Sequence, residues 1–188
     1  MIEIKKLEQL TFEQLKLFGE QSYSSDKKYD VIYNIKNDEI SFLLRSVKLE
    51  NNFKKNWAVN RKDHEVYAKL ISHGNSFGAY ENDELAGFIV TDRRSWNNSL
   101  WIEMIQVKED NRNNGTGTLL LKATEELAKQ NKIRLVELET QNTNVPAINF
   151  YRKNGYEFTG LNLTLYDPAE IKDEIAIYMS KIIRQQNN

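Results

Sequence analysis

Short stretches of alternating apolar and polar residues recur along the chain, with the two-residue period of a half-buried strand. Residues 1–7 form the first stretch. Residues 76–80 and 85–91 form two more, and the polar segment Glu81-Asn82-Asp83 between them predicts a hairpin. Further strands are predicted over residues 99–108, 133–140, 156–165 and 175–182.

Other stretches have apolar residues at helical spacing. Thr11 and Gln14 have the spacing of a capping box ahead of a short helix, and Asp63 is the expected N-cap of another. A longer helix is predicted to follow a glycine-containing loop and to run to about residue 130. A fourth is predicted over residues 145–154, where Gly155 suits the position just past a helix end.

Residues 20–60 have a weaker pattern. The polar segment 23–28 predicts a loop, and segment 40–49 fits either a strand or a helix. The chain therefore reads as strands, a glycine loop, a helix, a strand, a helix and further strands. This order predicts the α/β class, as a mixed and mostly antiparallel sheet with a βαβ unit and flanking helices. Without a repeat or linker, residues 1–188 are expected to form one domain.

Composition excludes several classes of protein. The formal net charge of −1 argues against a general nucleic-acid binder. The absence of cysteine removes disulfides, thiolate metal ligands and a cysteine nucleophile. His64 and His73 have no ligand partner at metal-binding spacing, so no metal site is expected. Short basic pairs such as Lys54-Lys55 are expected to be solvated.

The N-terminus has no apolar run long enough for a signal peptide or a membrane span. A cytoplasmic protein without a membrane partner is therefore expected.

The loop Arg112-Asn113-Asn114-Gly115-Thr116-Gly117 connects a predicted strand to a predicted helix. Glycine permits φ > 0 and a close approach of the backbone to a ligand. The first amides of a helix lack intrahelical partners and favour an anion such as a pyrophosphate. A P-loop would end in Gly-Lys-Ser/Thr, and a dinucleotide fingerprint would have a third glycine where this chain has Leu120. The loop is either a phosphate site of another kind or a tight turn without a ligand.

The spacing Arg-x-x-Gly-x-Gly in this loop resembles the acetyl-CoA loop of the GNAT superfamily of N-acetyltransferases. A second segment, from Asn144 to Tyr156, resembles that family's Asn-x-x-Ala-x-x-Phe-Tyr-x-x-x-Gly-Phe segment. The resemblance implies the acyl-CoA N-acyltransferase fold and acetyl-CoA as co-substrate. It implies that acetyl-CoA is bound by Ile105, Val107, Arg112, Asn113, Asn114, Gly115, Thr116, Gly117, Thr118, Asn144, Ala147 and Tyr151.

Residues 75–182 also resemble the streptothricin (nourseothricin) acetyltransferases, notably in Ser95-Trp96-Asn97-Asn98, Leu165-Tyr166-Asp167 and Ile177-Tyr178-Met179-Ser180. The resemblance implies a small cationic amine as substrate, with a streptothricin-type antibiotic as the leading hypothesis. Those enzymes tend to have Asp directly after the central-strand Glu, where this chain has Met104. A polyamine, an aminoglycoside and a protein N-terminus remain alternative acceptors, and a non-catalytic CoA-binding module is the competing class. Either a monomer or a homodimer is expected.

Acetyl transfer needs a neutral amine, because an alkyl ammonium with pKa about 10.4 has no free lone pair. A carboxylate can accept its proton. Glu103 is the leading candidate and, by strict alternation, would share a strand face with Ile105 and Val107. Glu139, at the end of a neighbouring strand, is the second candidate. Each is either a base or substrate ligand, or a solvated charge at a strand end.

The resemblance implies Tyr151 as the general acid that protonates the departing thiolate, and the backbone N–H near Val107 as donor to the acetyl carbonyl. Tyr151 is otherwise a packing residue. Asn144 either binds the pantetheine amides or caps a helix, and Arg112 either pairs with a phosphate or is solvated. Aromatic residues suit a cationic substrate. Those expected to line its pocket are Trp96 and Tyr166, whereas Trp101 is either a pocket or a packing residue.

Overall fold

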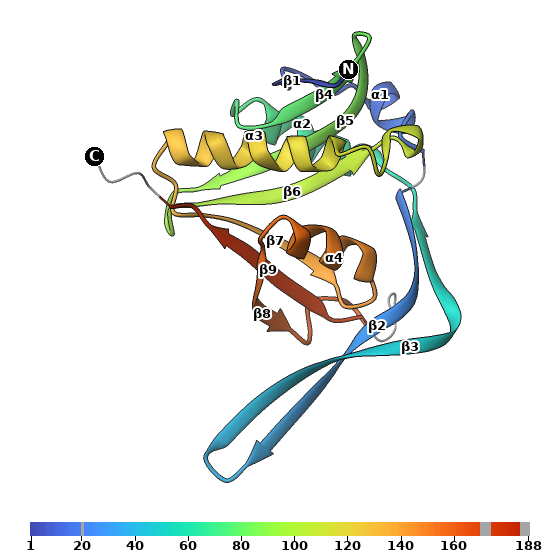
Figure 1. The fold of residues 1–188 in the computed structure, drawn as a ribbon, viewed down its shortest axis with the longest axis vertical. Helices are drawn as coiled ribbons and strands as arrows, with labels where there is room; N and C mark the ends of the chain where they lie inside the picture. The colour runs from blue at the N-terminus through green and yellow to red at the C-terminus, as the bar shows by residue number, and fades with distance from the viewer. Residues whose placement is uncertain (20, 170–173, 185–188) are drawn as a thin grey trace. The chain divides into compact units, whose positions relative to one another are not determined.

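The computed structural model describes residues 1–19, 21–169 and 174–184. The elements are drawn in Figure 1. In chain order they are β1 (Glu3–Lys6), α1 (Phe12–Lys16), β2 (Gln21–Lys36), β3 (Glu39–Trp57), α2 (Arg61–Ile71), β4 (Phe77–Glu81), β5 (Glu84–Arg94), β6 (Ser99–Val107), the short 3₁₀ turn η1 (Glu109–Asn111), α3 (Thr116–Gln130), β7 (Leu135–Gln141), α4 (Val145–Lys153), β8 (Glu157–Asn162) and β9 (Ala176–Ile182).

The main sheet has seven strands in the order β1-β4-β5-β6-β7-β9-β8, and β2 and β3 form a separate two-stranded ribbon. The pairs β1–β4, β4–β5 and β5–β6 are antiparallel, whereas β6 and β7 pair in parallel. The connection between β6 and β7 contains α3, so β6-α3-β7 is the predicted βαβ unit. The predicted fold class is confirmed.

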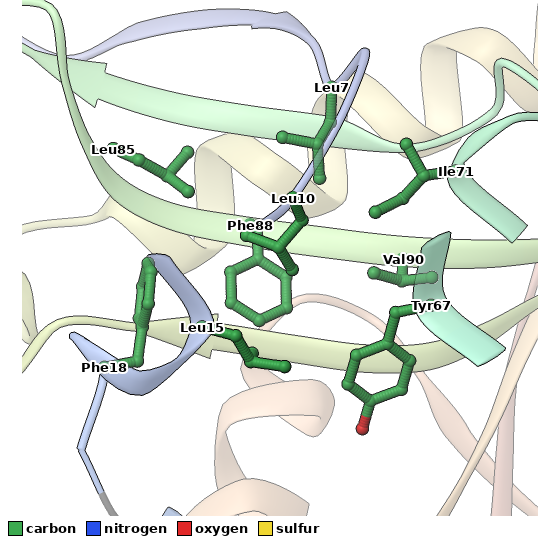
Figure 2. Packing of buried hydrophobic residues seen from close by; sticks show 9 residues of the cluster. All are labelled: Leu7, Leu10, Leu15, Phe18, Tyr67, Ile71, Leu85, Phe88 and Val90. Carbon is green, nitrogen blue, oxygen red and sulfur yellow. The ribbon is translucent and has the colours of Figure 1, made fainter. Parts of the chain in front are cut away.

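The chain divides into two compact units. The first consists of segments 1–21 and 57–138 with the C-terminal segment from Ser180, and the second consists of segments 22–56 and 139–179. In the first unit, a hydrophobic cluster fills the space between α1, α2 and one face of β5 (Figure 2). Phe18 and Phe88 meet edge to face at 4.9 Å within it. Burying one such side chain contributes about 1.5–3 kcal/mol.

Helix α3 packs against strands β4, β5 and β6 of the first unit (Figure 1). Its residues Leu120 and Leu121 are fully buried. Gly87 on β5 faces this helix closely, because a Cβ there would lie 3.1 Å from the Gln106 carbonyl oxygen and 3.4 Å from Leu120 Cδ1. The packing of α3 onto these strands therefore determines where its first turn lies in the first unit.

The ribbon of β2 and β3 corrects the expectation of a loop over residues 23–28 (Figure 1). Much of the ribbon is solvated on both faces, and both Ile35 and Ile40 are 62% exposed. Without a consistently buried face, the sequence of a ribbon carries little two-residue periodicity. In the second unit, the Tyr29 amide donates to the Asn142 carbonyl at 2.9 Å, and Asn142 Nδ2 donates back to the Tyr29 carbonyl at 2.9 Å.

Of the two helix N-caps predicted in the first unit, that of α1 is correct and that of α2 is wrong. Thr11 and Gln14 form the reciprocal capping box of α1. Helix α2, however, is capped by Asn60, whose Oδ1 accepts from the Asp63 amide at 2.9 Å. Asp63 is the third helical residue and returns a bond to the Asn60 amide, so it completes the box rather than capping the helix itself.

Within the part of the chain that the structure describes, no helix is both long enough and apolar enough to cross a membrane.

Candidate active site

The glycine loop presents a row of unbonded backbone amides. Among the described residues, the amides of residues 113–118 donate to no acceptor, whereas the Arg112 amide donates to the Glu109 carbonyl at 3.1 Å. Positive φ angles at Asn113 (61°) and Gly115 (84°) turn the chain into α3, which begins at Thr116. The predicted amide donors are therefore available from Asn113 onward, and the Arg112 amide is not one of them.

The Thr116 side chain, at the same place, is buried in the protein. Its Oγ1 atom is buried and has no hydrogen-bond partner within the described ranges, although a buried polar atom normally has one. A Cβ on Gly115 would meet nothing within 4 Å, so the loop has open space beside it. The unbonded amides and the positive end of the α3 dipole together suit a diphosphate.

Arg112 has a structural contact that the sequence did not indicate. Its Nε atom donates to the Val107 carbonyl at 3.1 Å, and the side chain is otherwise exposed. The guanidinium thus links the loop to the C-terminal end of β6. The Arg112 side chain makes this contact whether its remaining nitrogens pair with a phosphate or are solvated.

Near the C-terminal end of β6, the backbone amide of Val107 points away from β5. The Lys108 amide donates to the Ala86 carbonyl at 2.9 Å, so the next pair, Gly87 and Val107, is the non-hydrogen-bonded kind. The N–H of Val107 consequently points to the opposite edge of β6. Pairing with β7 covers only Ser99–Ile102 on that edge. The Val107 amide is thus directed as the predicted acetyl-carbonyl donor requires.

Glu103 is the extra residue of a β-bulge. The register of β5 and β6 shifts there, since Val90 is opposite Met104 and Thr91 is opposite Ile102. Ile102 and Ile105 therefore share a face although they are three residues apart. Strict alternation, which would have placed Glu103 with Ile105 and Val107, does not hold across the bulge. Bulges commonly re-aim a side chain next to an active site.

The carboxylate of Glu103 lies beside Trp101. Trp101 Nε1 donates to Glu103 Oε2 at 3.1 Å, and the guanidinium carbon of Arg94 is 3.9 Å from the Trp101 ring centroid. Glu103 is exposed and Trp101 is half-buried. Met104 packs, partly buried, against the cluster shown in Figure 2. The residue that departs from the streptothricin acetyltransferase pattern thus contributes to the core of the first unit.

Trp96 is not brought together with Glu103. It is 83% exposed in the turn between β5 and β6. The strand start at Ser99 is about 13 Å from Glu103 along β6, at roughly 3.3 Å per residue. The polar residues of this turn have structural partners instead, since Asn98 Nδ2 donates to the Lys132 carbonyl at 3.0 Å and Asn97 Nδ2 donates to Glu137 Oε1 at 3.2 Å.

The second unit contains the other predicted chemical residues. The Tyr166 hydroxyl donates to Glu139 Oε1 at 2.5 Å and accepts from Gln141 Nε2 at 3.0 Å. Burial, together with the hydrogen bond and charge of Glu139, raises the pKa of the Tyr166 phenol. Glu139 is thus half-buried and hydrogen-bonded, rather than a solvated charge at a strand end.

Tyr151 lies on α4 and is buried, with ring centroids 5.3 Å from Phe150 and 5.8 Å from Tyr156. Burial and, to a lesser extent, the charge of Glu139 raise the pKa of the Tyr151 phenol. A phenol with a raised pKa keeps its proton at neutral pH, as a general acid requires. Its hydroxyl has no hydrogen-bond partner among residues 1–19, 21–169 and 174–184.

Helix α4 starts at a cap that the sequence identified. Asn144 Oδ1 accepts from the Ala147 amide at 3.2 Å, which confirms Asn144 as the N-cap. The carboxamide nitrogen of Asn144 is not used by this cap. Binding of pantetheine by that nitrogen remains a prediction.

Sequence reasoning missed the partners of the second unit's carboxylates. Lys55 was expected to be solvated, but its ammonium pairs with Glu174, whose side chain is 0% exposed. Tyr23 Oη donates to Glu174 Oε1 at 2.9 Å, and Thr143 Oγ1 donates to the same oxygen at 2.7 Å. No local signal in the sequence relates these residues, because Lys55 and Glu174 are 119 positions apart.

A cavity of 720 Å³ opens in the same unit, between the ribbon and the segment that follows β8. Tyr166 and Glu174 border it together with Asp30 and Ile32 of β2. Its volume is in the range of pockets for small molecules. No group of three potential metal-ligand side chains was found among the described residues.

The fold, with its βαβ unit and the glycine loop that precedes α3, defines the class of α/β protein, and comparison with known proteins gives its family. The acetyltransferase (GNAT) family model matches residues 31–156, well over half of the 188-residue chain. The chain belongs to this family.

The particular relatives are streptothricin acetyltransferases. The chain is 37% identical over 97 residues to the streptothricin acetyltransferase of Streptomyces lavendulae, covering 52% of this chain and 51% of the relative. It is 38% identical over 86 residues to streptothricin acetyltransferase A of Bacillus subtilis, covering 46% and 50% respectively. The chain thus spans about half the length of these curated relatives. The resemblance stated from the sequence is confirmed.

Two solved structures share the fold over almost the whole chain. A nourseothricin acetyltransferase superposes with a TM-score of 0.76 at 27% identity, covering 97% of this chain and 99% of that one. A Bacillus anthracis str. Ames protein in complex with acetyl coenzyme A superposes with a TM-score of 0.71 at 27% identity, with the same coverage.

Proposed function

We propose that this protein is an acetyl-CoA-dependent N-acetyltransferase that acetylates a primary amine of a small cationic molecule, with a streptothricin-type antibiotic as substrate. The observation that carries the proposal is the run of unbonded amides from Asn113 to Thr118 at the start of α3. These donors suit the diphosphate of coenzyme A. One structural relative has been solved with acetyl coenzyme A.

In the proposed reaction, the amine attacks the thioester carbonyl directly in a ternary complex. Glu103 or Glu139 takes the ammonium proton and attracts the cationic substrate before that step. The amide of Val107, which points away from β5, donates to the oxygen on which negative charge develops. Tyr151 then gives its phenolic proton to the departing thiolate, and the second proton lost by the nitrogen neutralises the resulting phenolate. The products are an N-acetyl amide, free coenzyme A and the proton held by the carboxylate.

The streptothricin assignment rests on the names of the curated relatives and on carboxylates that suit a cation. Glu139 supplies a half-buried carboxylate that accepts a hydrogen bond from Tyr166, and Tyr166 borders a space of small-molecule size. Exposed Glu103 adds a second negative charge. A small-molecule acceptor, with neither nucleic acid nor membrane as partner, follows from this assignment. We also propose that the enzyme is cytoplasmic and that it is a monomer or a homodimer.

Incubation of the protein with acetyl-CoA and streptothricin tests the reaction and the substrate together. Mass spectrometry should show the gain of one acetyl group, and free thiol should appear at the same rate. A panel containing a polyamine, an aminoglycoside and a peptide with a free N-terminus separates other acceptors. Acetyl-CoA binding without thiol release from any amine would instead indicate a non-catalytic CoA-binding module.

Calorimetry tests the loop itself. Gly117→Trp should abolish acetyl-CoA binding, because the indole would occupy the space that the diphosphate needs. Gln130→Trp is the matched control on an exposed position at the far end of α3, about 20 Å away at 1.5 Å per residue. Equal affinity in wild type and Gly117→Trp would refute the assigned site.

A further inference from the structure

A chain of polar contacts in the second unit joins the ribbon strand β3 to Glu139. Lys55 on β3 pairs with Glu174, and its Nζ atom is 5.6 Å from the centroid of the Tyr166 ring. The hydroxyl of that ring donates to Glu139 Oε1. The Lys55 ammonium therefore lies over the face of the Tyr166 ring, and the hydroxyl of the same ring donates to the Glu139 carboxylate.

The direction of the Tyr166 proton is determined by its neighbours. The Gln141 side-chain nitrogen, 3.0 Å away, can only donate, so the phenolic oxygen accepts from it. The phenol has one proton, which is then directed to Glu139. A rotation of the ring would break both bonds, so the hydrogen bond that Tyr166 donates to the Glu139 carboxylate depends on where the ring is held.

Lys55 is prevented from leaving the ring by its own partner. The Glu174 side chain is fully buried and accepts from both Tyr23 and Thr143. A buried carboxylate needs a counter-charge, and Lys55 supplies it. Cations favour the face of an aromatic ring. Glu174 therefore fixes the lysine, and the lysine restricts the ring.

We infer that Lys55 is a positioning residue, which clamps the Tyr166 ring so that its hydroxyl orients Glu139 toward the amine substrate. The inference rests on the proposed function and deepens it, because it gives the acceptor end of the site a supporting residue from the ribbon. A purely structural role, in which the pair only fastens β3 to the segment before β9, is the competing explanation.

The test uses charge-balanced variants of the full chain. Lys55→Met alone leaves Glu174 buried without a counter-charge and is liable to misfold. The double variant Lys55→Met/Glu174→Gln removes both charges and keeps an acceptor for Tyr23 and Thr143. Lys55→Arg keeps the cation and should recover most of the turnover. The matched control is Lys54→Met, on the exposed neighbouring lysine of the same strand.

The double variant should lower kcat for the amine about tenfold, because misplacing a catalytic group by a fraction of an ångström already slows a reaction strongly. Its acetyl-CoA Kd should stay within about twofold of wild type. Tyr166→Phe should give a similar fall, and adding it to the double variant should lower kcat no further. Wild-type kcat in the double variant, or falls that multiply, would overturn the inference.

A crystal structure of the double variant separates this inference from the proposed function. The clamp predicts that the Tyr166 oxygen leaves Glu139 or loses its single orientation. Retention of that hydrogen bond would refute the clamp whether or not any amine is turned over. If wild type acetylates no amine while the bond is lost in the variant, the function is wrong and the clamp stands as a structural feature.

Discussion

Replacing Thr116 with valine should stabilise the free protein and leave its binding of acetyl-CoA unchanged. The two side chains have nearly the same shape, so the change removes little except the hydroxyl. That hydroxyl is buried and has no partner in the described structure, which makes it a source of instability in the free protein. It also lies at the first residue of α3, where the diphosphate is proposed to bind.

The magnitudes follow from the burial of this hydroxyl. A buried, unsatisfied polar group costs about 1–3 kcal/mol, so Thr116→Val should raise the free energy of unfolding by about 1 kcal/mol. For a chain of this size that corresponds to a rise in Tm of about 2–4 °C. The hydroxyl has no surface that a ligand could reach, so the Kd for acetyl-CoA should stay within about twofold of wild type.

Thr124→Val is the matched control, on the same helix and equally buried. The Thr124 hydroxyl donates to the Leu120 carbonyl at 3.0 Å, so it is already satisfied. Its loss should lower the free energy of unfolding slightly, by about 0.5–1.5 kcal/mol, and leave the Kd unchanged.

Urea unfolding measures the first quantity and calorimetric titration with acetyl-CoA measures the second. The reasoning fails if Thr116→Val lowers the free energy of unfolding, or if it weakens acetyl-CoA binding about tenfold or more. The first result would mean that the Thr116 hydroxyl has a partner in solution, and the second that the hydroxyl becomes accessible to the ligand.

Three further predictions concern the chemistry and the core. Tyr151→Phe should lower kcat at least tenfold while the acetyl-CoA Kd stays constant, because only proton donation is lost; equal turnover in stopped-flow thiol release would remove Tyr151 from the mechanism. Because the pKa of Tyr151 is raised, its phenol stays protonated as pH rises, so kcat should show no decline from this group below about pH 10; a decline centred near pH 8 that Tyr151→Phe abolishes would contradict this. Leu120→Ala should lower the free energy of unfolding by about 2–5 kcal/mol in urea titration, because Leu120 is fully buried against β5; a loss below about 1 kcal/mol would show that α3 is loosely packed there.

The cavity walls and the polar network of the second unit were not predictable from the sequence. Lys55 and Glu174 are 119 residues apart, and each looks like an ordinary surface charge among its sequence neighbours. The ribbon that carries Lys55 was not recognised, because it lacks a consistently buried face. Only long-range packing brings the ammonium to the carboxylate, and no periodicity in either segment records that contact.

Glu103 shows the same limit at short range. Its identity and its strand were predicted, but its direction was not, because the extra residue of the bulge lies opposite the junction of Val90 and Thr91 on another strand. A bulge changes which face each later side chain takes. The register of two paired strands decides this, and one strand alone does not.

What the sequence by itself determined is local. The order of elements from residue 76 onward, the capping box at Thr11, the cap at Asn144 and the glycine loop before α3 each depend on residues within a few positions of one another, and each was found in the structure. Tertiary structure decided the rest: the bulge at Glu103, the counter-charge of Glu174, and which loop amides remain unbonded. Local features follow from backbone propensity and neighbouring side chains, whereas these depend on which distant groups satisfy the same hydrogen bonds and charges.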